Sequence, residues 1–148
     1  MSVDATYSVL LADDSEDDRI LFEFAMTKVP GLKLIGSVTD GWEAMSYLEG
    51  SGDYADRQRF PLPDVLFLDL KMPRMTGFDV LGWLQKQTSK PRVIMLSGSD
   101  LTVDMEKAFS MGADYFKVKP TTSEAMVKLL QTTVEQVQSE VQTNAAAR

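Results

Sequence analysis

The sequence predicts an α/β protein in which a doubly wound sheet of five parallel strands carries five helices. The first observation is that short apolar segments alternate with segments of helical periodicity, as in parallel sheets whose strands are joined by helical crossovers. The second is that most of the apolar segments are hydrophobic at nearly every position, as expected of strands buried on both faces. The third is that polar residues follow these segments, where parallel sheets bind their ligands.

The N-terminal segment "YSVLLAD" at residues 7–13 is short and apolar, so we expect a buried strand. Ser15 is a good cap for a helix that runs to Val29, and Asp18 stands at the third helical position, as in a capping box. The apolar stripe predicted for this helix consists of Leu21, Phe24, Ala25 and Val29.

The middle of the chain continues the alternation of strands and helices. A strand at 32–38 leads to a helix over 40–50, and "VLFLD" at 65–69 is a third strand. Between them, "SGDYADRQRFPLP" at 51–63 has no periodicity and contains the glycines and prolines typical of loops.

The C-terminal half completes the pattern with five further elements. We expect helices at 77–87 and 103–112 and from about 123 to near 141, with strands at 91–98 and 113–120. The residues expected to face inward on the last two helices are Met105, Ala108 and Phe109, and then Met126, Leu129, Leu130, Val134, Val137 and Val141.

Size and composition limit the functional classes. The chain has 148 residues, which suits one domain over 1–148 with a core at about 8–138 and a frayed tail over 139–148. It contains no cysteine and no histidine, which excludes disulfides, histidine-based zinc sites, Ser-His-Asp triads and a phosphohistidine carrier. The net charge of −7 disfavours nucleic acid as a partner. No segment resembles a membrane span or a secretory signal, so we expect a cytoplasmic protein.

Polar side chains stand at the ends of four predicted strands: Asp13 and Asp14, Asp69, Ser97 and Lys119. Three carboxylates at one sheet edge would raise the pKa of at least one of them unless a cation were bound. Mg²⁺ prefers oxygen ligands of this kind. A metal, an ammonium and a hydroxyl around one carboxylate predict a site for a phosphoryl group.

These residues lie in four motifs, "ADDS", "LFLDLKMPRMTGFD", "VIMLSGS" and "FKVKP", which occur in this order and follow predicted strands. Together they resemble the response-regulator receiver domain of two-component signalling over residues 8–138. The resemblance implies a flavodoxin-like sheet with strand order 2-1-3-4-5. Because few residues follow the last predicted helix, we expect a stand-alone receiver, in which phosphorylation switches a docking surface.

The resemblance further implies a role for each residue around the acceptor. Asp69 would take the phosphoryl group from a phosphohistidine of a sensor histidine kinase. Asp14 and Asp69 would bind Mg²⁺ (or Mn²⁺) through their side chains and Lys71 through its backbone carbonyl. Asp13 would act through a bound water or by orienting the site.

Three further residues would read the phosphorylated state. Lys119 would contact the phosphoryl oxygens and Ser97 would hydrogen-bond one of them. Phe116 stands where the family has a rotating aromatic, and it either packs in the core or moves as a switch. The resemblance also implies a cis Lys119–Pro120 bond, and that Lys71 and Ser99 tune the phosphate lifetime.

Three features depart from the common pattern of that family. Ser97 stands where threonine is more common, and Phe116 where tyrosine is frequent. The segment 51–63 is longer than usual and resembles that of stand-alone receivers paired with phytochrome-like kinases.

Three alternative functions fit these residues less well. A phosphatase that forms an aspartyl phosphate expects a second aspartate two residues after the first, where this chain has Lys71. A nucleotide-binding module would need a glycine-rich loop after the first strand, where this chain has the acid pair Asp13 and Asp14. A pseudo-receiver would have an incomplete acceptor site, whereas all the acceptor-site residues are present in this sequence. Glu16, Asp17 and Asp18 are expected to lie in water, as acids favoured at a helix N-terminus. Besides the kinase, a histidine phosphotransfer protein or an effector could be the partner, and dimerisation on phosphorylation stays open.

Overall fold

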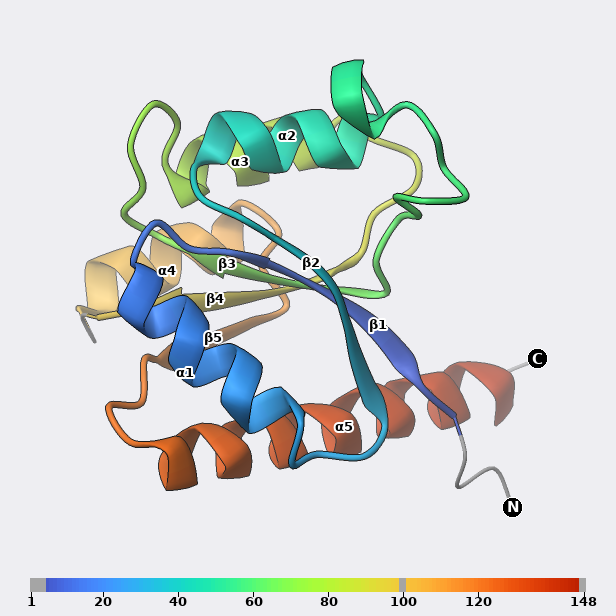
Figure 1. Cartoon of the computed structure of the whole chain (residues 1–148), viewed down its shortest axis with the longest axis vertical. Coiled ribbons are helices and arrows are strands. Elements are labelled where there is room, and N and C mark those ends of the chain that lie inside the picture. Colours follow the sequence, from blue (N-terminus) through green and yellow to red (C-terminus); the bar gives the residue numbers. More distant parts are fainter. Residues whose placement is uncertain (1–4, 99–100, 147–148) are drawn as a thin grey trace.

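The computed structural model of the chain describes residues 5–98 and 101–146. Its five strands form one parallel sheet in the order β2-β1-β3-β4-β5, which confirms the predicted fold class and strand order (Figure 1). The strands are β1 (Tyr7–Ala12), β2 (Leu32–Val38), β3 (Val65–Asp69), β4 (Arg92–Ser97) and β5 (Tyr115–Val118). The helices are α1 (Glu16–Met26), α2 (Gly41–Glu49), α3 (Gly77–Leu84), α4 (Thr102–Ser110) and α5 (Ser123–Ala146), with a short 3₁₀ helix η1 (Gly52–Tyr54) after α2.

The central strand β3 is buried on both faces, as its apolar sequence predicts. Leu66 and Leu68 pack in the core beneath α2, α3 and α4. Val65 and Phe67 pack on the opposite face, beneath α1 and α5, where the Phe67 ring lies edge-on to Phe22 at 5.0 Å between centroids. The sheet therefore supports two separate cores and holds the end of β3, Asp69, in a fixed position.

The apolar stripe of α1 differs from the prediction at Phe24, which is 52% exposed, while Phe22 is buried. Either Phe22 or Phe24 would fit the helical spacing of this stripe, so packing against the sheet decides which of the two rings is buried. The Lys28 ammonium covers the exposed Phe24 ring at 5.3 Å from its centroid. Buried Ala25 and Val29 agree with the prediction.

The fourth helix, α4, contributes little to the core. Ala108 is buried as predicted, but the expectation for Phe109 is wrong because its side chain is 46% exposed. Leu101 and Val103, at the start of this helix, are also exposed. With one small buried side chain, α4 is held by less apolar contact than helices that bury several large residues.

The last helix, α5, continues to Ala146, so the expectation of a frayed tail from residue 139 is wrong for this part of the chain. Glu140 explains the extension, because it accepts a hydrogen bond from Tyr115 Oη at 2.7 Å and pairs with Arg92. These contacts tie the late turns of the helix to β4 and β5. Val141, predicted to face inward, is 42% exposed. No described helix is long and apolar enough to cross a membrane.

The segment 51–63 is folded onto the end of α2 by Arg57. Its Nη1 donates to the carbonyls of Tyr47 (2.7 Å) and Phe60 (3.0 Å), and its Nη2 donates to the carbonyl of Leu48 (2.6 Å). The guanidinium lies against Gly50, whose φ of 75° ends the helix and where a Cβ would lie 2.7 Å from Arg57 Cζ. Carbonyls that a helix end normally leaves unpaired are thus satisfied by a side chain from the following segment.

An aromatic cluster completes this unit. The Tyr54 ring lies 4.9 Å from Tyr47 and 5.1 Å from Phe60, between centroids. Its hydroxyl donates to Glu43 on α2 at 2.9 Å, and burial together with this hydrogen bond raises the pKa of Tyr54 to about 12. Although its sequence is aperiodic, the segment 51–63 is therefore held in an ordered conformation by contacts of its side chains.

Candidate functional site

The polar residues predicted to meet at one sheet edge do so. Asp13 and Asp14 follow β1, and Asp69 ends β3, which is the neighbouring strand. Carboxylate oxygens from these three residues all lie within 4.8 Å of one another. Asp13 and Asp69 are buried, whereas Asp14 is exposed. The arrangement places two buried acids beside one that solvent can reach.

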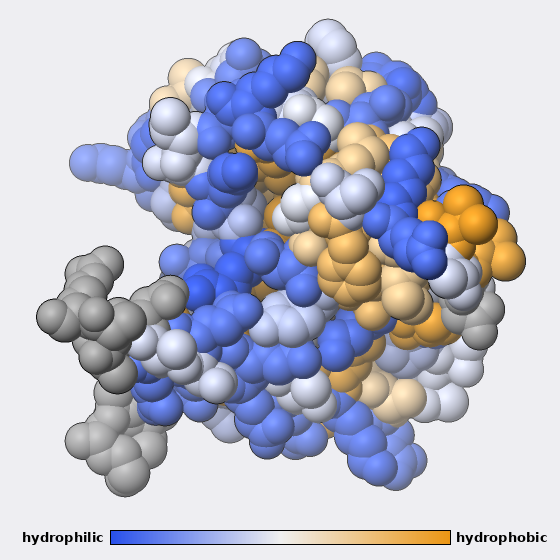
Figure 2. Space-filling model, turned by 180° about the vertical axis from the view of Figure 1, so that it is seen from behind, coloured by the Kyte–Doolittle hydropathy of each residue, from blue (hydrophilic) through white to orange (hydrophobic). Residues whose placement is uncertain are grey.

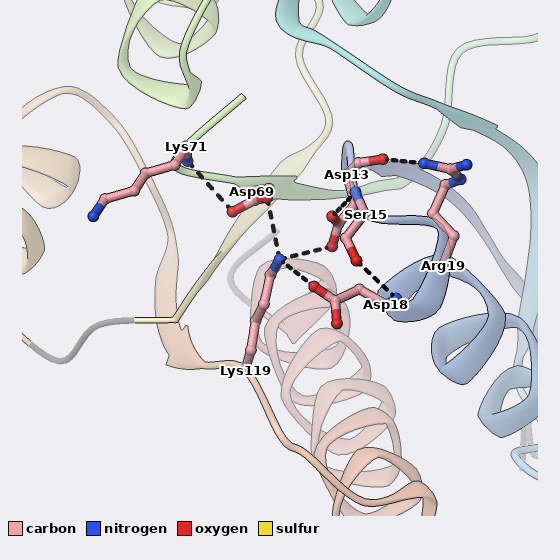
Figure 3. A network of polar contacts seen from close by, with 7 residues as sticks. All are labelled: Asp13, Ser15, Asp18, Arg19, Asp69, Lys71 and Lys119. Atoms are coloured by element: carbon pink, nitrogen blue, oxygen red, sulfur yellow. Dashed lines mark hydrogen bonds and ion pairs between the residues drawn. The ribbon is translucent and has the colours of Figure 1, made fainter. Parts of the chain in front are cut away.

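The ammonium of Lys119 lies at the centre of this edge and contacts three carboxylates (Figure 3). The distances from its Nζ are 2.9 Å to Asp13 Oδ2, 2.8 Å to Asp18 Oδ2 and 3.1 Å to Asp69 Oδ2. Since an ammonium has three N–H groups, this arrangement can use every donor that Lys119 has.

Asp18 corrects the expectation that Glu16, Asp17 and Asp18 all lie in water. Asp18 points from α1 toward Lys119, and 39% of its side chain is exposed (Figure 3). The predicted capping box is half formed, because the Asp18 N–H donates to Ser15 Oγ at 3.2 Å while the Asp18 carboxylate binds Lys119 instead of the Ser15 N–H. Glu16 and Asp17 are exposed, as expected.

The first turn of α1 also fixes Asp13. The Arg19 Nη1 donates to the Asp13 carbonyl at 2.9 Å, and the Ser15 N–H donates to Asp13 Oδ1 at 3.0 Å. Neither Arg19 nor Asp18 was predicted to serve the site. Asp18 and Arg19 stand three and four residues after the helix cap Ser15, so both side chains point back toward the end of β1. This spacing from a helix cap is the sequence signal that could have identified them.

The loop after Asp69 approaches it closely through Gly77, the first residue of α3. A Cβ at Gly77 would lie 2.5 Å from the Asp69 carbonyl, and the Gly77 N–H donates to the carbonyl of Leu70 at 2.9 Å. The Lys71 N–H donates to Asp69 Oδ1 at 3.4 Å, while its ammonium points away from the site (Figure 3). Glycine is required here because helix α3 begins against the backbone at the end of β3.

The remaining predicted residues flank this edge. Ser97 is buried at the end of β4, and its carbonyl accepts a hydrogen bond from the Lys119 N–H at 2.7 Å. Phe116 is half-buried and packs against the core beneath α2, α3 and α4. The expected cis Lys119–Pro120 bond is wrong, because this bond is trans, the isomer favoured intrinsically before proline. Ser99 lies outside the described residues.

The two buried charges titrate differently from free side chains. Burial raises the pKa of Asp69 to about 6; the charge of Asp13 adds to this shift, while Lys119 opposes it. Burial alone would lower the pKa of Lys119, but its hydrogen bonds to Asp18 and Asp13 outweigh burial and raise it. Lys119 therefore stays charged at neutral pH, and Asp69 is mostly ionised there.

The donor set fits a hard divalent cation. Lys119 contacts the carboxylates of Asp13, Asp18 and Asp69, and an Asp14 oxygen lies within 4.8 Å of oxygens of Asp13 and Asp69, so acidic groups outnumber basic groups at this edge. Oxygens from three of these residues are close enough to bind one ion, and one of the three is open to solvent. Mg²⁺ binds through few protein carboxylates and retains waters, so this edge suits it.

Comparisons with known proteins agree with this geometry. A family model described as the response regulator receiver domain matches residues 9–131. The protein-glutamate methylesterase/protein-glutamine glutaminase of Treponema denticola is 35% identical over 122 residues, which cover 79% of this chain and 29% of that protein. The chain spans between 29% and 40% of the length of six curated relatives of this kind.

Two solved structures are similar over most of their length. The phosphorylated cyanobacterial phytochrome response regulator RcpA superposes with a TM-score of 0.77 at 25% identity, covering 88% of this chain and 93% of that one. The response regulator RPA3017, in red light signaling of R. palustris, has a TM-score of 0.75 at 28% identity, covering 86% and 90%.

Proposed function

The chain belongs to the response regulator receiver domain family, and we propose that it accepts a phosphoryl group on Asp69 from a phosphohistidine of a sensor histidine kinase. One observation carries the proposal: the buried Asp69 carboxylate contacts the Lys119 ammonium and lies within 4.8 Å of carboxylate oxygens of Asp13 and Asp14. We also propose that it acts in the cytoplasm.

The transfer is a substitution at phosphorus. A carboxylate oxygen of Asp69 forms the new O–P bond while the P–N bond to the kinase imidazole breaks, and the nitrogen leaves with the electron pair. The pKa of about 6 keeps Asp69 mainly ionised at neutral pH, yet makes it more basic than an ordinary carboxylate. Hydrolysis of the acyl phosphate by water would later restore Asp69.

The residues around Asp69 would stabilise the transferred group. Lys119 would move its hydrogen bond from Asp69 to a phosphoryl oxygen, and Ser97 would donate to another. A Mg²⁺ or Mn²⁺ ion would be held by Asp14, Asp69 and the Lys71 carbonyl, with Asp13 acting through a water or by orienting the site. When bound, the ion would neutralise charge on the phosphoryl oxygens.

The output would follow from the added charge. The acyl phosphate would draw Ser97 toward it, and Phe116 would fill the space behind. The exposed apolar side chains over α4 and β5 form the surface that would change, and hydrophobic residues gather at this side of the molecule in Figure 2. These exposed side chains are Leu101, Val103, Phe109 and Val118.

The partner is proposed from similarity alone. Two solved relatives are described as acting with phytochrome or in red light signaling, so kinases of the phytochrome type are the first candidates. A histidine phosphotransfer protein or an effector would receive the signal.

Incubation with acetyl phosphate and Mg²⁺, followed by intact-mass measurement, tests the proposed function. Wild-type protein should gain the mass of one phosphoryl group, and Asp69→Asn should gain none. Asp17→Asn, which removes an exposed acid nearby, is the matched control and should behave as wild type. Absence of a mass gain in wild type, under conditions that preserve acyl phosphates, would contradict the proposal.

A further inference from the structure

We propose that Asp18 is a positioning residue for phosphoryl transfer, which holds the Lys119 ammonium beside Asp69 while the phosphoryl group arrives. The inference rests on the proposed function, since it gives Asp18 a task in that reaction. It separates Asp18 from Glu16 and Asp17, the other acids in the first turn of α1.

The geometry of Lys119 is the first support. Each of its three carboxylate contacts is within hydrogen-bond distance, and the contact to Asp18, at 2.8 Å, is the shortest. Lysine has a flexible four-carbon stem, so its ammonium takes a defined position only where several partners hold it. Asp13 and Asp69 hold it from the sheet, and Asp18 holds it from a helix.

The second support is that Asp18 differs from the other two partners of Lys119. Its side chain is 39% exposed, against 3% for Asp13 and 7% for Asp69. It lies outside the group of three carboxylates that could share a metal ion. Phosphorylation would take the Asp69 contact away from Lys119, and a metal would compete for Asp13. Asp18 is therefore the partner that can keep its contact throughout the reaction.

The third support is that Asp18 is itself held in place. Its N–H donates to the Ser15 hydroxyl, and α1 is anchored to the core by Phe22 and Ala25. The next residue, Arg19, binds the Asp13 carbonyl. One turn of a packed helix therefore fixes both Lys119 and Asp13, as expected where a site needs accurate placement of charged groups.

The test compares Asp18→Ala with Asp17→Ala, which removes the same charge one residue away from an exposed position. The measurement is the rate of phosphorylation by acetyl phosphate at saturating Mg²⁺ and donor, where binding of either no longer limits the rate. Loss of a partly exposed, charge-assisted hydrogen bond should lower this rate about three- to tenfold in Asp18→Ala. Asp17→Ala should stay within about twofold, as expected for an exposed residue with no role in the site.

Two further variants separate positioning from a general structural effect. Asp18→Glu, which restores a carboxylate on a longer stem, should recover part of the lost rate. In a double-mutant cycle with Lys119→Ala, the effect of Asp18→Ala should disappear, because Asp18 acts through Lys119. An equal loss in the Lys119→Ala background would overturn the inference, as would identical rates in Asp18→Ala and Asp17→Ala.

A second readout does not depend on phosphorylation. The ¹⁵N resonance of the Lys119 ammonium, assigned with Lys119→Arg, should shift or broaden in Asp18→Ala and not in Asp17→Ala. If wild type accepted no phosphoryl group, the proposed function would fail and this resonance would still decide whether Asp18 holds Lys119. An unchanged resonance in Asp18→Ala would refute the positioning role.

Discussion

Lys119 and Arg57 each contact three acceptor groups, but the two networks differ in charge. The acceptors of Arg57 are main-chain carbonyls, which are neutral. The acceptors of Lys119 are carboxylates, with the Asp14 carboxylate close by. The acceptors of Arg57 therefore carry no charge, whereas the carboxylates around Lys119 outnumber its single positive charge.

The difference distinguishes a structural network from a functional one. Hydrogen bonds from one guanidinium to uncharged carbonyls stabilise the segment that they connect, because no like charges repel one another there. An excess of like charge in a partly buried site raises the free energy of the folded state, and it persists where binding or catalysis uses it. Altering the two networks should therefore change the free energy of unfolding in opposite directions.

Removing Asp14 should have the largest effect. Asp14→Ala should abolish Mg²⁺-dependent phosphorylation by acetyl phosphate, because the exposed ligand of the proposed metal site is lost. Phosphorylation is measured by intact mass across a range of Mg²⁺ concentrations. Asp17→Ala is the control and should keep the wild-type Mg²⁺ dependence. Equal losses in both variants would mean that these acids act only through their charge.

Neutralising Asp69 should stabilise the protein. The pKa of Asp69 is about 6 in the folded protein against an ordinary value of 3.8, so the folded state binds the proton more tightly than the unfolded state. Stability from this group is present below pH 4 and is lost as the pH rises toward 6. At pH 7, without metal, Asp69→Asn should therefore be more stable than wild type by up to about 3 kcal/mol.

Chemical denaturation in EDTA from pH 4 to pH 7 measures this effect. The difference in free energy of unfolding between Asp69→Asn and wild type should grow as the pH rises to about 6 and then level off. Asp79→Asn is unsuitable as a control, because Asp79 belongs to the capping box of α3 and its substitution would itself change the free energy of unfolding. Asp17→Asn, the same substitution at an exposed position, is the control. If the stability advantage of Asp69→Asn over wild type became smaller as the pH rose, the site would not carry the excess of negative charge described above.

Much of the fold and site follows from sequence patterns. Apolar strands and their polar ends predict the sheet, the edge shared by Asp13, Asp14 and Asp69, and the approach of Lys119. These predictions succeed because parallel strands bring their carboxyl ends to one edge whatever the details of packing.

The features that sequence reasoning missed depend on tertiary contacts. Phe24 and Phe22 fit helical spacing equally well, and only the position of the sheet buries Phe22. Asp18 has a good local reason to lie in water, and it is recruited by a lysine 101 residues away. The order of the segment 51–63 depends on Arg57 reaching carbonyls nine and ten residues before it, which no periodicity reports.

Removing Arg57 should have the smallest of these effects and the opposite sign to Asp69→Asn. Arg57→Ala leaves three carbonyls without this donor, so the free energy of unfolding should fall by about 2 kcal/mol. The Asp69 site lies outside this network, so the rate of phosphorylation by acetyl phosphate should remain at the wild-type value. Arg59→Ala, which removes an exposed arginine stacked on Phe60, is the matched control and should cost about 0.5 kcal/mol. A large loss of phosphorylation in Arg57→Ala, with little loss of stability, would show that charge balance does not separate the two networks.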